Sequence, residues 1–116
     1  MKLETESKNG SRAFGGFDPA TDPHLREVLG DSYDFGAYVR LEQGKEIYMQ
    51  AGGEGDGPYK LEYREGDAEH HFQAAGELRR ADLLRAFSSY LAGDNRWRTE
   101  FTWQKLEMKK PKWKFW

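Results

Sequence analysis

The adjacent histidines His70 and His71 are the residues whose chemistry would best suit a metal ion or a general base. They lie in EHHFQA, which alternates as a strand does, and neighbouring strand residues point to opposite faces of a sheet. The two imidazoles therefore cannot easily share one ion. His24 is far away in sequence, and the chain has no H-x-x-x-H or H-E-x-x-H spacing. We expect one partly buried and one solvated histidine, with no metal site and no cofactor.

The glycine-rich segment GGEGDG, residues 52–57, could in principle form a phosphate or calcium loop. Glu54 and Asp56 would repel a phosphate, and the lysine and Ser/Thr of a P-loop are absent. The carboxylate spacing also differs from that of the twelve-residue calcium loop. We predict a connection between two strands, because glycine tolerates positive φ angles.

Carboxylates and serines provide no stronger indication of catalysis. Glu62, Glu65 and Asp67 flank Arg64, but strand alternation separates some of them, and a charged outer sheet face accounts for these side chains. The paired serines of FSSYL fall inside a predicted helix, and no G-x-S-x-G elbow is present. The sequence therefore predicts a protein that is not an enzyme.

The composition fits a single domain. At 116 residues the chain is large enough for one core and too small for two. It contains no cysteine, so stability must come from packing, to which an aromatic content of 15% contributes. No apolar run is long enough to cross a membrane, and the N-terminal segment lacks the apolar region of a secretory signal. We expect a cytoplasmic protein.

The charge is unevenly distributed along the chain. The formal net charge is −2, yet residues 105–116 contain five lysines and one glutamate, which leaves 13 basic and 19 acidic side chains in residues 1–104. An acidic body disfavours contact with nucleic-acid phosphates, which requires clustered Lys and Arg, and suits a basic partner. The tail EMKKPKWKFW mixes lysines with aromatic residues; we interpret it as a peripheral extension.

Alternation of apolar and polar residues predicts an antiparallel meander of four to five strands. The first strand begins at Gly36, and a turn at Gln43-Gly44-Lys45 leads into the second, EIYMQA. YKLEYRE and EHHFQA are the third and fourth strands. Phe101 and Trp103 lie two positions apart, as they would in a fifth strand.

Two helices and two flanking segments complete the predicted α+β fold. TDPHLREVLG predicts a short N-terminal helix capped by Thr21 or Asp22. ELRRADLLRAFSSYLAGD predicts the main helix, which packs on one face of the sheet and ends at Gly93. We expect residues 1–20 to form a flexible arm, residues 21–106 a single domain and residues 107–116 a basic-aromatic tail.

Three segments resemble a broad group of small bacterial α+β proteins, most of them uncharacterised. The similar segments are YVRLEQGKEIYMQAGG, YKLEYREG and LLRAFSSYLAGDNRWRTEFTW, within about residues 22–104. Some members of this group resemble immunity proteins of polymorphic toxin systems, which bind and block a partner toxin without doing chemistry. The resemblance implies a protein-binding function with a basic toxin domain as partner, which an acidic body would suit.

Six residues are the candidates for contact with a partner. All six lie at positions that recur in the resemblance: Tyr48, Gln50, Glu62, Tyr63, Arg64 and Asp94. Asp94 has two further interpretations, as a cap of the following turn or as an ion-pair partner of Arg96 or Arg98.

Two other functions stay open at the level of the sequence. One is a small enzyme or small-molecule-binding domain that uses the sheet face near His70 and His71. The other is contact with nucleic acid or a membrane surface through the C-terminal tail.

Overall fold

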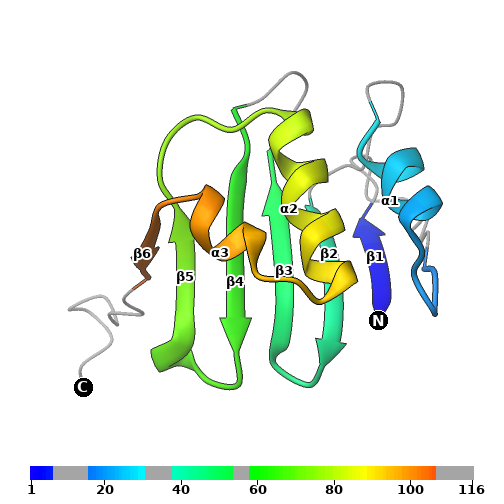
Figure 1. Cartoon of the computed structure of the whole chain (residues 1–116). Helices are drawn as coiled ribbons and strands as arrows, with labels where there is room; N and C mark the ends of the chain where they lie inside the picture. The colour runs from blue at the N-terminus through cyan, green and yellow to red at the C-terminus, as the bar shows by residue number, and fades with distance from the viewer. Residues whose placement is uncertain (7–15, 31–37, 54–57, 107–116) are drawn as a thin grey trace.

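The computed structural model describes residues 1–6, 16–30, 38–53 and 58–106, which form one antiparallel sheet with helices on one face (Figure 1). The strands follow one another in chain order across the sheet. They are β1 (Lys2–Glu6), β2 (Tyr38–Gly44), β3 (Ile47–Gly52), β4 (Lys60–Glu65), β5 (His71–Ala74) and β6 (Trp103–Lys105). The predicted α+β fold with an antiparallel meander is confirmed, but the sheet has six strands and not four or five.

The additional strand is β1, at one edge of the sheet. It pairs with β2, where Leu3 lies opposite Leu41, and Phe17 forms a bridge back to Leu3. The expectation of a flexible arm is therefore wrong for Lys2–Glu6. The inward residues of β1 are Leu3 and Thr5, so only one apolar side chain marks its alternation, and the strand is held by partners distant in the chain. Residues 7–15 and the tail at 107–116 lie outside the described residues.

The helices are α1 (Asp22–Val28), α2 (Arg80–Ala92) and α3 (Arg96–Glu100), with a short 3₁₀ turn, η1 (Ala68–His70), before β5. Thr21 is the N-cap of α1, as predicted, and Gly93 ends α2 with a φ of 79°. This left-handed conformation is one that glycine adopts without steric cost. None of the described helices is long and apolar enough to cross a membrane.

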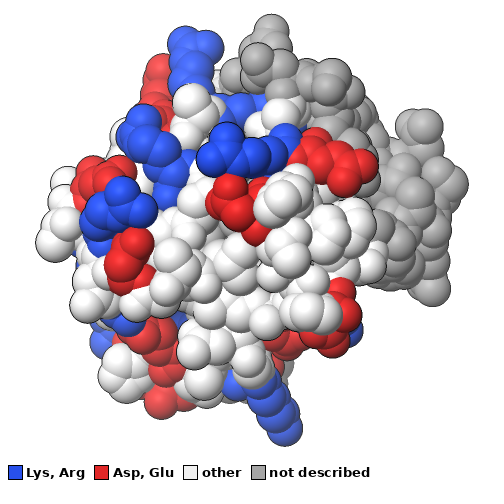
Figure 2. Space-filling model, turned by 45° about the vertical axis from the view of Figure 1, so that its right-hand side comes forward, with Lys and Arg blue, Asp and Glu red and all other residues white. Residues whose placement is uncertain are grey.

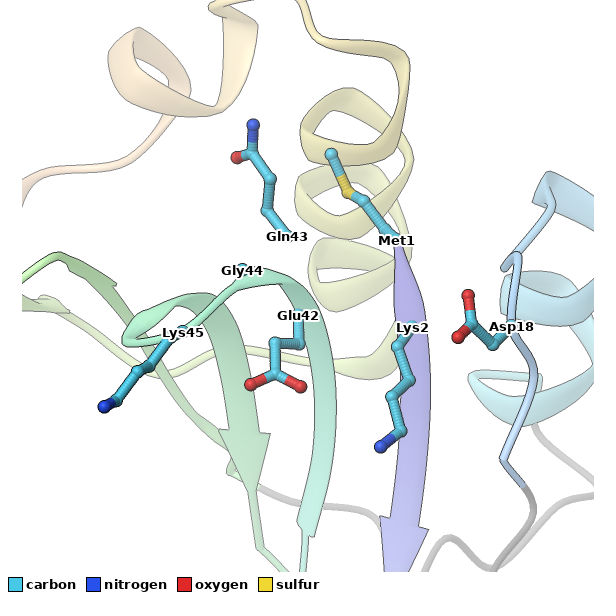
Figure 3. Close-up of a pocket in the computed structure, with 7 residues that line it drawn as sticks. All are labelled: Met1, Lys2, Asp18, Glu42, Gln43, Gly44 and Lys45. Carbon is cyan, nitrogen blue, oxygen red and sulfur yellow. The ribbon is translucent and has the colours of Figure 1, made fainter.

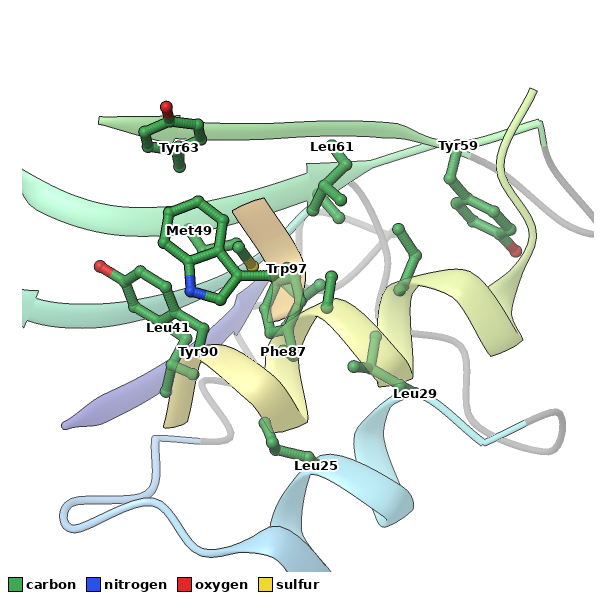
Figure 4. Close-up of a cluster of buried hydrophobic side chains, with 14 of the residues drawn as sticks. Leu25, Leu29, Leu41, Met49, Tyr59, Leu61, Tyr63, Phe87, Tyr90 and Trp97 are labelled. Carbon is green, nitrogen blue, oxygen red and sulfur yellow. The ribbon is translucent and has the colours of Figure 1, made fainter. Parts of the chain in front are cut away.

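The core lies between the sheet and α2 (Figure 4). The inward residues of β2 to β5 are directly opposite one another across the strands: Leu41, Met49, Tyr63 and Phe72. Phe87 of α2 is completely buried below this row, and α1 packs on α2 through Leu25. Each large apolar side chain buried in this way contributes about 1.5–3 kcal/mol.

An aromatic cluster closes the core between α3, β5 and β6. The ring centroid of Tyr63 lies 4.7 Å from those of both Trp97 and Trp103, with the rings edge to face. The indole N–H of Trp103 donates to the Trp97 carbonyl at 3.1 Å. Burial also raises the pKa of Tyr90, next to Trp97, to about 12. The cluster joins the C-terminal strand to the helical layer.

Candidate partner-binding face

The sheet face opposite to the helices carries a continuous polar surface, which we call the outer face. One row of directly opposed residues crosses all six strands with a polar side chain on each: Glu4, Arg40, Gln50, Glu62, Gln73 and Gln104. The next row contains Lys2, Glu42, Tyr48, Arg64 and His71. Because side chains alternate along a strand, the buried neighbours of these residues fix their outward direction.

Arg40 and Gln50 form the centre of the outer face. The Nε–H and Nη2–H groups of Arg40 donate to the Gln50 side-chain oxygen at 2.9 and 2.6 Å. The same guanidinium lies 4.1 Å from the centroid of the Tyr48 ring. A cation over an aromatic face is attracted by the ring quadrupole. Tyr48 is only 7% exposed, although none of the described helices covers this face.

Glu62 and His71 form a pair beside this centre. The distance from His71 Nε2 to Glu62 Oε1 is 2.8 Å, and the ring of Tyr48 meets the imidazole edge-on. His71 is 6% exposed, and its buried Nδ1 has no hydrogen-bond partner in the part of the chain that the structure describes. A general base must reach the proton that it removes. A substrate on the outer face would not reach Nδ1.

Four of the six predicted contact residues come together here: Tyr48, Gln50, Glu62 and Arg64. Arg64 forms an ion pair with Glu46 at 3.1 Å. Strand alternation places Tyr48 with Gln50, and Glu62 with Arg64, on one side of their own strands. The β3–β4 register then brings both pairs to the same face of the sheet. Arg40 and Gln73 were not among the predicted contact residues. The β2–β3 register, with its shift between Glu42 and Gly44, places Arg40 in the row, and the β4–β5 register places Gln73 there; no local pattern gives these registers.

The other two predicted contact residues lie elsewhere. Tyr63 points inward, where burial raises the pKa of its phenol, so its expected surface role is wrong. Asp94 follows α2 and accepts hydrogen bonds from the Ser89 hydroxyl and, at 3.0 Å, from the Arg96 backbone N–H. These bonds, with the adjacent Arg96 guanidinium, lower the pKa of Asp94. Asp94 thus caps the turn and pairs with Arg96, which are two of the roles considered for it.

The histidines are separated, as predicted, with one buried and one exposed. His70 lies in η1 and not in a strand, and its Nδ1 is 2.8 Å from Asp67 Oδ1. His24 accepts the Thr21 backbone N–H at 3.1 Å, which is a helix-capping contact. Among the described residues, no three His, Asp or Glu side chains converge to hold a metal ion.

Charges on the molecule alternate in sign. On the outer face Glu4, Glu42 and Glu62 are interspersed with Lys2 and Arg40. Figure 2 shows the side of the molecule that lies to the right in Figure 1, where lysine and arginine side chains also lie beside acidic ones. The excess of carboxylates in the sequence therefore does not form a uniform acidic patch on these surfaces.

An open depression lies at the corner of the outer face, where β1 meets β2 (Figure 3). Lys2 and Glu42 project from these neighbouring strands, and the Lys2 ammonium bonds Glu4 at 2.8 Å, which raises the pKa of Lys2. Glu42 has no ion-pair partner among the described residues. It lies opposite Lys2, and its charge also contributes to the raised pKa of Lys2.

Comparisons of the chain with known protein families, with curated proteins and with solved structures find no match. The function must therefore be argued from the geometry of the outer face.

Proposed function

We propose that the protein is a non-enzymatic protein-binding module that contacts its partner through the outer face. The observation that supports this proposal is the row of polar side chains that crosses all six strands on the face without helices. A broad sheet surface of this kind suits another protein better than a small molecule, which binds in a concave pocket. Tyrosine and arginine, both present here, are enriched among residues that contribute most to binding.

The side chains of the outer face are held in place before a partner arrives. Gln50 and the Tyr48 ring hold Arg40, and His71 holds Glu62. Ordering a free, rotamer-rich side chain costs about 0.5–1.5 kcal/mol on binding. A surface ordered in advance avoids much of this cost, which favours recognition by the outer face.

For the partner we propose a basic toxin domain, and for the protein the role of a cytoplasmic immunity protein. The resemblance to immunity proteins supports this class of partner. Glu4 and Glu42 lie where they could meet lysine or arginine side chains of the partner. Glu42 has no ion-pair partner among the described residues. Alternating charges would select a partner of matching pattern, because like charges placed opposite one another are strongly unfavourable.

Growth rescue tests the proposal. The protein is co-expressed with a toxic domain encoded beside its gene, and we expect the wild type to restore growth. A Glu42→Lys, Gln73→Lys double variant, which changes two positions of the outer face, should lose rescue and co-purification. A Glu77→Lys, Ala92→Lys variant has the same charge change at exposed positions away from the outer face and should keep both.

Two outcomes would overturn the proposal in different ways. Equal rescue by both variants would show that the outer face is not the contact surface. Repeated absence of a toxic domain near genes for similar chains would remove the immunity role.

A further inference from the structure

A second surface lies on the opposite side of the molecule, within the helical layer. A groove runs over α2 between α1 and α3, and its lining is Arg26, Leu84, Arg85, Ser88, Arg96 and Glu100. The floor comes from α2, and the walls from the helices that pack on either side of it. Leu84 is half-buried there and provides an apolar contact.

The groove is lined by more basic than acidic side chains, although the chain as a whole is acidic. Three of its residues are arginines, and Glu100 is its single carboxylate. The side chains of Arg26, Arg85 and Arg96 are 69%, 57% and 69% exposed. Each arginine is paired with a carboxylate: Arg26 with Asp22, Arg85 with Asp82 and Glu100, and Arg96 with Asp94. Of these carboxylates only Glu100 lines the groove.

These arginines keep unused donors. A guanidinium has five N–H groups. Arg26 uses its Nε–H for Asp22, and Arg96 uses its Nε–H and Nη2–H for Asp94. Their Nη1 groups have no hydrogen-bond partner among the residues that the structure describes. An incoming carboxylate can bind these unused donors. If it also competes with the paired aspartates, the cost is small, because exposed ion pairs contribute only about 0–1 kcal/mol.

We propose that this groove binds an acidic segment of a partner protein, with carboxylates against the arginines and an apolar side chain against Leu84. The charge of the lining selects acidic over basic segments. The volume of the groove, about 240 Å³, is below the roughly 300–1,000 Å³ of small-molecule pockets and suits a few side chains of a larger partner. The site is independent of the outer face and of the function proposed for it.

The test uses short capped peptides and ¹⁵N-labelled full-length protein. A peptide of alternating glutamate and leucine should shift the backbone amide resonances of Leu84, Arg85 and Ser88 and leave that of Gln50 unchanged. The same peptide with glutamine in place of glutamate should not bind. Arg26→Gln with Arg96→Gln should weaken binding about tenfold, because charge-assisted hydrogen bonds are lost. Lys45→Gln, an exposed charge loss in the β2–β3 turn, is the control.

Three results would overturn the proposal. They are the absence of shifts at the groove up to millimolar peptide, equal binding of the glutamine peptide, and equal effects of the arginine variant and of Lys45→Gln. Since neither substituted arginine is buried, the variant should remain folded, and its unperturbed resonances outside the groove will verify this.

Discussion

Asp94 illustrates how one residue can look like a contact residue and yet stabilise the fold. It follows Gly93 at the end of α2 and holds Ser89 and the backbone of Arg96, so it connects α2 to α3. The Ser89 hydroxyl in turn accepts the Trp97 backbone N–H at 3.1 Å. Because Trp97 belongs to the aromatic cluster, the carboxylate of Asp94 helps to orient a core residue.

Asp94→Asn should lower the melting temperature by a few degrees at pH 7. The folded-state pKa of Asp94 lies below the ordinary value of 3.8, so its contribution is present above that value and is lost as pH falls through the lowered pKa. The melting temperatures of the wild type and the variant should therefore converge as the pH falls through the lowered pKa of Asp94. Glu77→Gln, the same charge loss at an exposed site, should show no such convergence. A gap that persists at low pH would contradict this account.

At the scale of elements, β1 shows what a local pattern does not reveal. The helices and the four central strands have apolar residues at their characteristic spacing, which depends only on nearby residues. β1 has few inward positions, and it belongs to the sheet because β2 offers a free edge and Leu3 enters the core. The free edge of β2 and the core residues around Leu3 both lie many residues away along the chain.

Leu3→Ala should cost about 2–5 kcal/mol of unfolding free energy, since Leu3 is completely buried and its removal leaves a cavity. Lys2→Ala is the matched control. Its exposed pairing with Glu4 contributes at most about 1 kcal/mol. Urea unfolding monitored by tryptophan fluorescence measures both values. Equal stability of the two variants would show that β1 is not part of the cooperative unit.

For the molecule as a whole, the proposed function gives the two faces of the sheet separate tasks. Met49 and Gln50 are neighbours in β3, yet Met49 is buried under the helical layer and Gln50 lies on the outer face. A substitution at one of them should therefore affect stability, and at the other binding.

Met49→Ala should lower the unfolding free energy by about 2–5 kcal/mol and leave partner binding intact below its melting temperature. Gln50→Ala should cost no more than about 1.5 kcal/mol, because Arg40 can bond water instead, and it should weaken binding. Urea unfolding and co-purification with the partner measure the two effects. Loss of binding with Met49→Ala alone would contradict the assignment of tasks to the faces.

The sequence by itself determined the fold class, the central strands, and the caps Thr21 and Gly93. These follow from periods of two or 3.6 residues and from terminal residues, which act over a few positions. Only the tertiary structure decided that β1 joins the sheet, that Tyr63 faces the helices, and that Glu62 meets His71. These depend on register and on which face α2 covers, and contacts between distant segments set both.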